Sequence, residues 1–177
     1  MSAPVRRHLA LIGLMGAGKS SVGMACAEIL GWPFVDTDAL IESLVGRGIA
    51  DIFMHEGEHA FREYEREAVR VATEAEAAQV ISCGGGVIMD PDNRARLVES
   101  SYVAWLRAEP ETLARRVERS YTVRPLLEGE APIRSLVKLA AERDPIYEEV
   151  ADVAVSTDRR AVADIAASIV AAWQARL

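Results

Sequence analysis

The stretch that decides the fold lies near the amino terminus and reads HLALIGLMGAGKSS, from His8 to Ser21. Its first five residues form a short, largely apolar run typical of a strand, and Gly13 to Ser20 then match the pattern G-x-x-x-x-G-K-[ST]. Glycines in this pattern let backbone N–H groups point inward around a phosphate, and the following helix adds the positive end of its dipole. The sequence therefore predicts a nucleotide-phosphate site, with a purely structural glycine turn as the alternative.

The residues of this loop have different predicted tasks. Lys19 would bridge the outer phosphates, and the hydroxyl of Ser20 would be a magnesium ligand. A phosphate loop alone indicates a nucleotide and leaves the reaction open. The residues predicted to bind the nucleotide here are Gly16, Ala17, Gly18, Lys19, Ser20 and Ser21.

The rest of the chain alternates short apolar runs with longer segments of helical period. This alternation predicts an α/β fold of three layers, α/β/α, in which helices cover both faces of a five-stranded parallel sheet. We expect a single domain over residues 1–177. The expected strands are His8–Ile12, Pro33–Val35, Gln79–Cys83, Tyr102–Leu106 and Asp152–Val155. The expected helices are about 19–30, 39–45, 58–77, 92–99, 110–118, 133–149 and 160–175.

Composition excludes several classes of protein. The 177 residues are 50% hydrophobic and carry a formal net charge of -7, which argues against a general nucleic-acid or membrane-surface binder, since both need basic faces. Arg6 and Arg7 imitate an export signal, but no small-residue cleavage pattern follows, and no apolar run is long enough to span a membrane. Cys26 and Cys83 suggest neither a disulfide framework nor a zinc site. We expect a cytoplasmic protein with a small-molecule partner.

Two carboxylates end the second predicted strand, in the sequence Phe34-Val35-Asp36-Thr37-Asp38. Spaced by two residues, they point to the same side of an extended chain, close to the phosphate loop. One carboxylate could help to hold magnesium, and the other could orient or deprotonate an attacking hydroxyl. The alternative is that Asp36 only ends the strand and Asp38 only caps the next helix.

Three glycines, Gly84, Gly85 and Gly86, follow the third predicted strand. They suggest that backbone must closely approach a ligand there, and a plain turn is the alternative. Arg62 lies in the helix expected from residue 58, four residues after Glu58 and three before Glu65. Taken alone, that spacing favours ion pairs on a helix surface over a ligand-binding arginine.

Proline, glycine and charged residues between 120 and 132 predict a loop between two helices. A loop of this length often covers a site, so we expect a lid at about 119–132. Arginines gather at and inside it, namely Arg115, Arg116, Arg119 and Arg124. A mobile arginine could neutralise phosphate charge during transfer, although ordinary helix-face charge explains Arg115 equally well.

A competing motif, His55-Glu56-Gly57-Glu58-His59, matches the zinc-protease patterns H-E-x-x-H and H-x-x-E-H. Both patterns need the two histidines on one face of a continuous helix, and Gly57 is expected to break the helix. No histidine follows His59 to serve as a third ligand. Two solvent-facing histidines beside a turn are favoured, and a zinc hydrolase is the alternative.

Taken together, these motifs resemble the shikimate kinase family over about residues 8–175. The matching elements are G-x-x-G-x-G-K-S at Gly13–Ser20, F-x-D-x-D at Phe34–Asp38, I-F-x-x-x-G-E-x-x-F-R-x-x-E at Ile52–Glu65, G-G-G at Gly84–Gly86, R-P-L at Arg124–Leu126 and R-x-P-x-Y at Arg143–Tyr147. The resemblance implies a P-loop kinase fold with a lid. It implies magnesium-dependent transfer of the γ-phosphoryl group of ATP to the 3-hydroxyl of shikimate, which gives shikimate 3-phosphate and ADP in chorismate and aromatic amino-acid biosynthesis.

The resemblance also implies a role for each matching residue. Asp38 would bind the hydroxyl and serve as base, and Asp36 would support a single magnesium ion per subunit beside Ser20. Arg62 and Arg143 would hold the substrate carboxylate, so that Arg62 becomes a ligand. The substrate would further contact Gly84, Gly85 and Gly86, and the helical segment at about 38–66 would bind it. Asp38, Lys19 and Arg124 would be catalytic, with Arg124 reaching the phosphates from the lid.

One position departs from the family pattern, because Val117 stands where the family commonly has an arginine beside adenine. Arg116 is expected to fill that role if a residue is inserted between Arg119 and Val123, and Arg119 is the other possibility. The loop at 156–159 would form the other wall of the adenine pocket. A gluconate-type or nucleotide kinase, and a regulatory nucleotide-binding module that does not need Asp38, are the competing functions. We expect a monomer that binds neither nucleic acid nor membrane.

Overall fold

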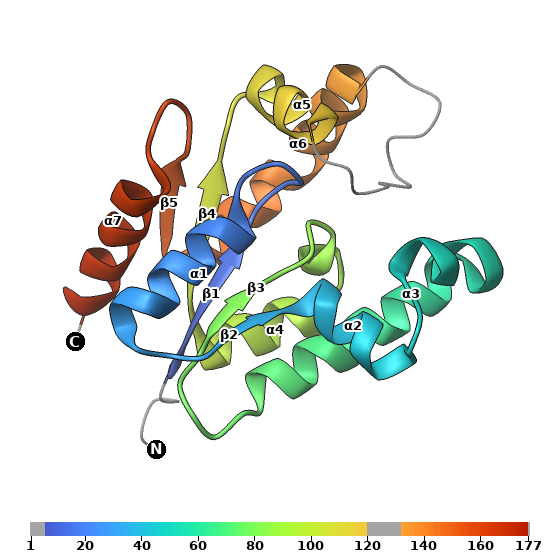
Figure 1. Cartoon of the computed structure of the whole chain (residues 1–177), viewed down its shortest axis with the longest axis horizontal. Coiled ribbons are helices and arrows are strands. Elements are labelled where there is room, and N and C mark those ends of the chain that lie inside the picture. The colour runs from blue at the N-terminus through green and yellow to red at the C-terminus, as the bar shows by residue number, and fades with distance from the viewer. Residues whose placement is uncertain (1–5, 120–131, 177) are drawn as a thin grey trace.

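Five parallel strands form the sheet of the computed structural model, which describes residues 6–119 and 132–176 (Figure 1). The predicted lid, apart from its ends, and Arg124 lie outside the described residues. The strands are β1 (His8–Ile12), β2 (Phe34–Asp36), β3 (Val80–Ser82), β4 (Ser101–Arg107) and β5 (Val153–Ser156). The helices are α1 (Lys19–Leu30), α2 (Thr37–Val45), α3 (Ile49–Thr73), the 3-10 turn η1 (Val87–Met89), α4 (Pro91–Ser100), α5 (Pro110–Glu118), α6 (Pro132–Val150) and α7 (Val162–Gln174).

The strands lie in the order β2-β3-β1-β4-β5, with β1 at the centre. Leu9 on β1 is opposite Val80 on β3 and Tyr102 on β4, and every pairing in the sheet is parallel. All five residues of β1 are buried, as expected for a parallel strand covered on both faces. The predicted five-stranded parallel sheet is therefore confirmed.

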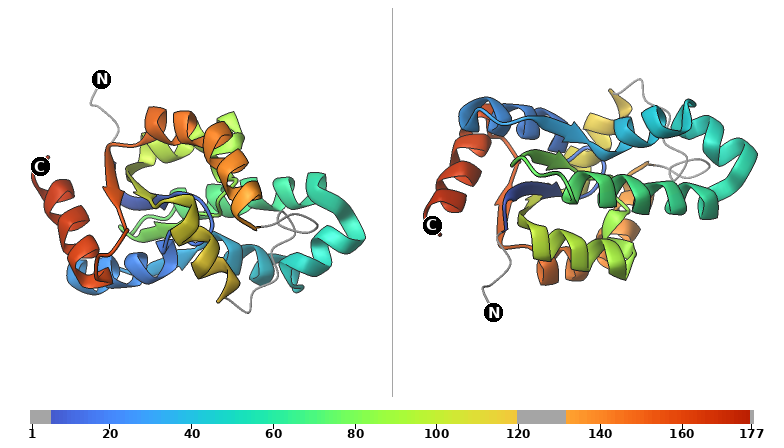
Figure 2. Two further views of the ribbon diagram at one scale, coloured as in Figure 1. Left: turned by 90° about the horizontal axis from the view of Figure 1, so that it is seen from above. Right: turned by 90° about the horizontal axis from the view of Figure 1, so that it is seen from below.

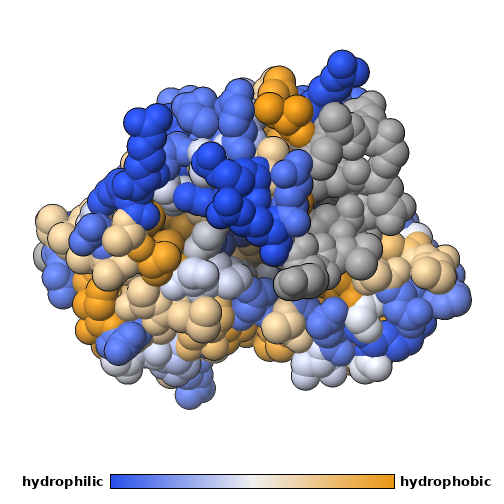
Figure 3. Space-filling model, turned by 45° about the horizontal axis from the view of Figure 1, so that its top comes forward, coloured by the Kyte–Doolittle hydropathy of each residue, from blue (hydrophilic) through white to orange (hydrophobic). Residues whose placement is uncertain are grey.

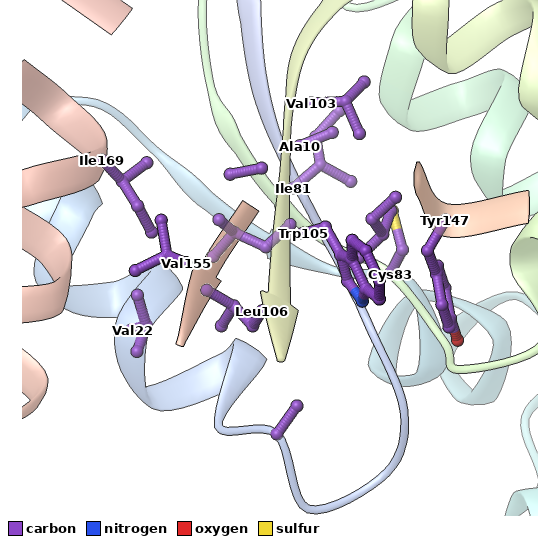
Figure 4. Close-up of a cluster of buried hydrophobic side chains, with 14 of the residues drawn as sticks. Ala10, Val22, Ile81, Cys83, Val103, Trp105, Leu106, Tyr147, Val155 and Ile169 are labelled. Atoms are coloured by element: carbon purple, nitrogen blue, oxygen red, sulfur yellow. The ribbon is translucent and has the colours of Figure 1, made fainter. Parts of the chain in front are cut away.

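Helices cover both faces of this sheet and make the predicted three layers (Figure 2). Helices α1 and α7 pack together on one face, whereas α4 and α6 lie on the other, with the second half of α3 beside α4. Buried apolar side chains fill the space between the layers (Figure 4). Val22 of α1 and Ile169 of α7 lie on one side of β4, and Tyr147 of α6 lies on the other, where its ring stacks on Trp105.

The largest error of the predicted bounds concerns α3, which was expected at about 58–77 and runs from Ile49 to Thr73. Residues 49–56 form a helix because Ile52 and its neighbours pack against α2. At the other end, the alanine-rich stretch after Thr73 is a loop, whose carbonyls at Ala75 and Glu76 accept hydrogen bonds from Arg7. Among the described residues, no helix has the length and apolar character needed to cross a membrane.

Candidate active site

A cleft of about 730 Å³ opens where the strands of the sheet end. Its walls include the loop after β1, the end of β2 with α2, the first half of α3, and the three glycines after β3. Ligands of open parallel sheets bind at this edge, outside the carboxyl ends of the strands. Figure 3 looks toward this end of the molecule, where hydrophilic side chains gather near the centre of the view.

The loop after β1 has the backbone geometry of a phosphate cradle. Gly13, Gly16 and Gly18 all have positive φ, at 143°, 80° and 92°. A Cβ atom would stand 2.4 Å from the Leu106 carbonyl oxygen if added to Gly13, so only glycine fits there. Gly18 is the N-cap of α1, whose first residue is Lys19, so the positive end of the helix dipole faces the cleft.

Some residues of the loop line the cleft, and others are buried in the core. Gly16, Gly18, Lys19, Ser20 and Ser21 line the cleft, and their binding of a nucleotide stays a prediction. The Nζ atom of Lys19 donates a 2.9 Å hydrogen bond to the Leu14 carbonyl, which places its charge over the loop. Ala17 differs, because its side chain is buried in the hydrophobic core. A ligand would therefore meet the backbone of Ala17.

Three side-chain oxygen atoms lie close together between the phosphate loop and the end of β2. The Ser20 hydroxyl donates to Asp36 Oδ2 over 2.7 Å, and Ser82 Oγ lies 3.4 Å from Ser20 Oγ. Hydroxyl and carboxylate oxygens are the ligands that Mg²⁺ takes in proteins. The chemistry of these side chains fits a magnesium ion beside the phosphate loop.

Asp36 also determines where α2 begins. Its Oδ1 atom accepts hydrogen bonds from the backbone N–H groups of Asp38 and Ala39, at 3.0 and 3.5 Å, so Asp36 is the N-cap of the helix. The sequence alternative assigned the cap to Asp38, and that alternative is wrong. Asp38 lies in the first helical turn and lines the cleft. Both carboxylates thus stand at the predicted edge of the sheet.

The three glycines after β3 leave room for charged side chains of the cleft. A Cβ atom on Gly84 would lie 2.8 Å from Asp38 Oδ1, and a Cβ atom on Gly86 would lie 2.4 Å from Arg62 Nη1. Neither glycine has a positive φ, so the turn itself does not require them. The site's own side chains approach this backbone closely, and the predicted approach of a ligand to it stays a prediction.

Arg62 is held in the cleft by two carboxylates of its own helix. Its Nη2 atom lies 3.0 Å from Glu58 Oε1, and its Nη1 atom lies 2.9 Å from Glu65 Oε2. The ion pairs expected from the spacing are present, and Arg62 lines the cleft as well. Glu65 is 1% exposed, and this burial raises the pKa of its carboxyl, although the charge of Arg62 partly offsets the effect.

Arg143 reaches the cleft from α6, whereas Arg62 reaches it from α3. Its Nη1 atom donates to the Gly85 carbonyl over 3.0 Å, and the Tyr147 hydroxyl donates to the same oxygen over 2.5 Å. The Arg143 Nε atom is buried and has no hydrogen-bond partner among the described residues. A guanidinium that lines a cleft is suited to hold an anion there.

At the other end of the cleft, Arg116 joins the phosphate loop to the loop after β5. Its Nη1 atom donates to the Gly16 carbonyl at 3.1 Å and to Thr157 Oγ1 at 2.9 Å, while Nη2 donates to the Thr157 carbonyl. Val117 is turned inward and is buried against Gly16. The structure therefore brings Arg116 to the cleft beside the 156–159 loop. Arg115 is exposed and bonds Thr112.

The H-E-x-x-H stretch does not have the geometry of a zinc site. Gly57 has φ 82° and ψ 177°, a conformation that interrupts α3 between the two histidines, as the sequence predicts. His55 pairs with Asp51 on its own half of the helix, at 3.2 Å. Since the two rings do not share a continuous helical face, the requirement of the motif is not met.

Several residues in the cleft or packed beside it have tasks that the sequence does not predict. Glu65 belongs to one of the matching motifs. The signal in the sequence for its role beside Arg62 is its spacing of three residues from that arginine. Phe61 lies under the Arg62 guanidinium, 5.2 Å from ring centroid to Cζ, and packs on Phe53. Tyr147 is likewise part of the R-x-P-x-Y motif, whose spacing of four on a helix could have placed it beside Arg143.

A phosphate loop after the central strand, in one cleft with a carboxylate and two guanidinium groups, defines a P-loop kinase that acts on a small molecule. The family model described as shikimate kinase matches residues 15–174. The chain therefore belongs to the shikimate kinase family.

Individual relatives agree with this assignment. The chain is 46% identical over 170 residues to a shikimate kinase of Symbiobacterium thermophilum, with 96% of this chain and 97% of the relative covered. It is 42% identical over 171 residues to a shikimate kinase of Moorella thermoacetica, with 96% of each chain covered. A solved shikimate kinase from Acinetobacter baumannii, in complex with shikimate, matches with a TM-score of 0.92, 36% identity, and 98% and 96% coverage of the two chains.

A gluconokinase from Sinorhizobium meliloti matches less well, with a TM-score of 0.57 and 23% identity over 97% of this chain and 94% of that one. That likeness shows a shared fold alone. The comparisons thus favour the shikimate kinase prediction over the gluconate-kinase alternative.

Proposed function

We propose that this chain is a shikimate kinase, which transfers the γ-phosphoryl group of ATP to the 3-hydroxyl of shikimate. The observation that carries the proposal is that Arg62, Arg143 and Asp38 line the same cleft as the phosphate loop, in a member of the shikimate kinase family. Two guanidinium groups select a carboxylate over a neutral sugar, because a charge-assisted pair is stronger than a neutral hydrogen bond. The solved relative that binds shikimate supports the same substrate.

In the proposed reaction, Asp38 orients the 3-hydroxyl and accepts its proton. The hydroxyl oxygen then forms a bond to the γ-phosphorus, while the bond from that phosphorus to the β–γ bridging oxygen breaks and ADP leaves. Arg62 and Arg143 hold the substrate carboxylate, and the backbone at Gly84, Gly85 and Gly86 borders the ring. Catalysis comes from positioning and from electrostatic stabilisation of the transferred group.

The nucleotide is proposed to bind along the phosphate loop. Backbone N–H groups from Gly16 to Ser21 surround the phosphates, and Lys19 stabilises charge on the outer ones. Arg116 and the loop at 156–159 flank the base, with Arg124 acting from the lid segment. Ser20 and Asp36 would hold one magnesium ion per subunit, which when bound neutralises charge on the β- and γ-phosphate oxygens.

We also propose the domain organisation, the oligomeric state and the cellular location of this enzyme. Residues 1–177 form a single kinase domain, with the lid at about 119–132 and the substrate-binding helices within about 38–66. The protein acts as a monomer in the cytoplasm on ATP and shikimate. Its net charge of -7 supports the absence of a nucleic-acid or membrane partner.

The test is release of ADP from MgATP by the purified protein, with shikimate, gluconate or a nucleoside monophosphate as acceptor. We expect turnover with shikimate alone. In Asp38→Asn, turnover should fall at least about 100-fold while ATP affinity is retained, since the amide cannot accept the proton. Turnover with gluconate but not shikimate would overturn the assigned substrate, and wild-type turnover in Asp38→Asn would overturn the assigned base.

A further inference from the structure

Thr37 stands between the two carboxylates of the cleft, yet its own side chain is fully buried. It is the first residue of α2 and is 0% exposed. Its Oγ1 atom accepts a 3.0 Å hydrogen bond from the backbone N–H of Gly84, which lies 47 residues further along the chain. This bond joins the start of α2 to the start of the three-glycine turn.

The position of this bond follows from the register of the sheet. Asp36 on β2 is opposite Ser82 on β3, and both strands end there. Past that point the two backbones separate, because the chain after β2 turns into α2 while the chain after β3 enters the glycine turn. The side chain of Thr37 spans this gap and supplies the acceptor that a continuing β2 strand would otherwise provide.

Gly84 is the place where the turn touches the reactive groups. Its missing Cβ leaves room for Asp38 Oδ1, 2.8 Å from where that atom would be, and for Glu65 Oε1 at 3.2 Å. Gly84 has no side chain to anchor it, so hydrogen bonds fix its backbone. The Gly84 carbonyl accepts from Val87, whereas its N–H donates to Thr37.

We propose that Thr37 is a positioning residue for phosphoryl transfer, which fixes the distance between Asp38 and the glycine turn that borders the substrate. The inference rests on the proposed function, since it presumes that Asp38 meets the acceptor hydroxyl and that the turn contacts the same molecule. Loss of the Thr37 acceptor leaves a buried N–H unpaired. The turn then shifts to find another acceptor, and the distance between the Asp38 carboxylate and the substrate is no longer fixed.

The test compares Thr37→Val, which keeps the shape of the side chain but cannot accept, with Thr37→Ser, which keeps the hydroxyl. For Thr37→Val we expect kcat/KM for shikimate to fall about 10- to 100-fold, with KM for ATP changed less than about 2-fold. Thr37→Ser should retain at least about one third of the wild-type kcat/KM. A fall of equal size in both variants, or wild-type kinetics in Thr37→Val, overturns the proposal.

A matched control separates positioning from loss of stability. Thr73→Val removes a threonine hydroxyl that bonds the Val69 carbonyl within α3, away from the cleft, and should lower Tm without changing kcat/KM. If Thr37→Val does not fold, Thr37→Cys takes its place: its thiol is a weaker acceptor than a hydroxyl, so its kcat/KM for shikimate should fall further than that of Thr37→Ser, and equal kcat/KM values in the two variants would overturn the proposal.

Amide hydrogen exchange gives a readout that does not depend on turnover. The Gly84 N–H should exchange faster in Thr37→Val than in Thr37→Ser, and unchanged exchange contradicts the proposed bond. If the wild-type protein shows no shikimate-dependent turnover, the proposed function fails, while the exchange result still decides whether Thr37 holds the turn.

Discussion

At the scale of single residues, the site is organised by glycines that make room for charge. Gly86 is the clearest case, since the place of its absent Cβ is taken by the guanidinium of Arg62. That guanidinium forms ion pairs with the carboxylates of Glu58 and Glu65, and Arg62 also lines the cleft. The identity of residue 86 therefore controls where the positive charge of Arg62 stands.

Gly86→Ala should weaken shikimate binding without disrupting the fold. The new methyl group would lie 2.4 Å from Arg62 Nη1, and the long arginine side chain can move aside, whereas backbone could not. Displacing one charge-assisted hydrogen bond should raise KM for shikimate about 10-fold or more, with KM for ATP nearly unchanged. Steady-state kinetics with each substrate varied in turn measures both constants.

Gly48→Ala is the comparison for this substitution, since Gly48 also lines the cleft but an added Cβ there would make only an ordinary 3.5 Å contact with Glu42. It should change KM for shikimate less than about 2-fold, because it displaces no guanidinium. If Gly86→Ala raises both Michaelis constants alike, the effect is not transmitted through Arg62.

The places of several polar residues in the cleft could be predicted from the sequence because their spacing follows from short-range geometry. Asp36 and Asp38 follow a strand, and Lys19 and Ser20 begin a helix, so their direction is determined locally. The task of Thr37 could not be predicted in this way. Its partner Gly84 is 47 residues distant, and only the register of β2 on β3 brings the two together.

At the scale of secondary structure, α3 is two helices joined at Gly57. The first half, with Ile49 and Phe53, borders the cleft, and the second half carries Arg62 and Glu65. The φ of 82° and ψ of 177° at Gly57 lie in a region that only glycine adopts readily. An added Cβ would meet nothing within 4 Å, so the glycine is required by the backbone alone.

Gly57→Ala should therefore destabilise the protein by about 1–3 kcal/mol, the cost of a strained backbone conformation. It should also raise KM for shikimate, because relief of the strain changes the angle between the two halves of α3. Gly31→Ala is the comparison. Gly31 has φ 66° and ψ 30° at the end of α1, a left-handed conformation in which alanine costs about 1–2 kcal/mol. Gly31 does not line the cleft.

Urea unfolding measures both costs, and the kinetic assay measures the effect on the cleft. Equal KM values in Gly57→Ala and Gly31→Ala would show that the break in α3 does not shape the substrate site. A loss of stability well below about 1 kcal/mol in Gly57→Ala would contradict the assigned strain.

Helix bounds were harder to predict than helix existence. The glycine at 57 predicts a break correctly, but the sequence predicts no helix for the eight residues before it, since so short a segment gives little periodic signal. Their helical state depends on the packing of Ile52 and Phe53 against neighbours on α2 and α3. The stretch after Thr73 has high helix propensity, and tertiary bonds from Arg7 override it.

At the scale of the whole molecule, the two ends of the sheet serve different purposes. Charged groups at the carboxyl ends of the strands face the cleft, while the amino end of β1 holds a buried histidine, His8. Its Nε2 atom lies 3.2 Å from the Thr73 carbonyl and so donates to it, whereas Nδ1 is buried without a partner among the described residues. This arrangement fits the neutral ring.

Burial lowers the pKa of His8 from its usual value of about 6.5, and the charge of Arg7 lowers it further, although the bond to Thr73 partly offsets both. Below pH 6.5 the unfolded chain therefore binds a proton at this position that the folded protein does not yet bind. The stability that this group contributes is fully present above the unfolded pKa and is lost as the pH falls through the lowered folded pKa.

His8→Gln should accordingly make the protein less sensitive to acid. The glutamine amide can still donate to the Thr73 carbonyl but does not titrate, so the free energy of unfolding should fall less steeply than in the wild type as the pH falls below about 6.5. Urea unfolding at a series of pH values measures this slope. Parallel slopes in the wild type and His8→Gln would mean that His8 is protonated equally in the folded and unfolded states, and the buried neutral ring would then be wrong.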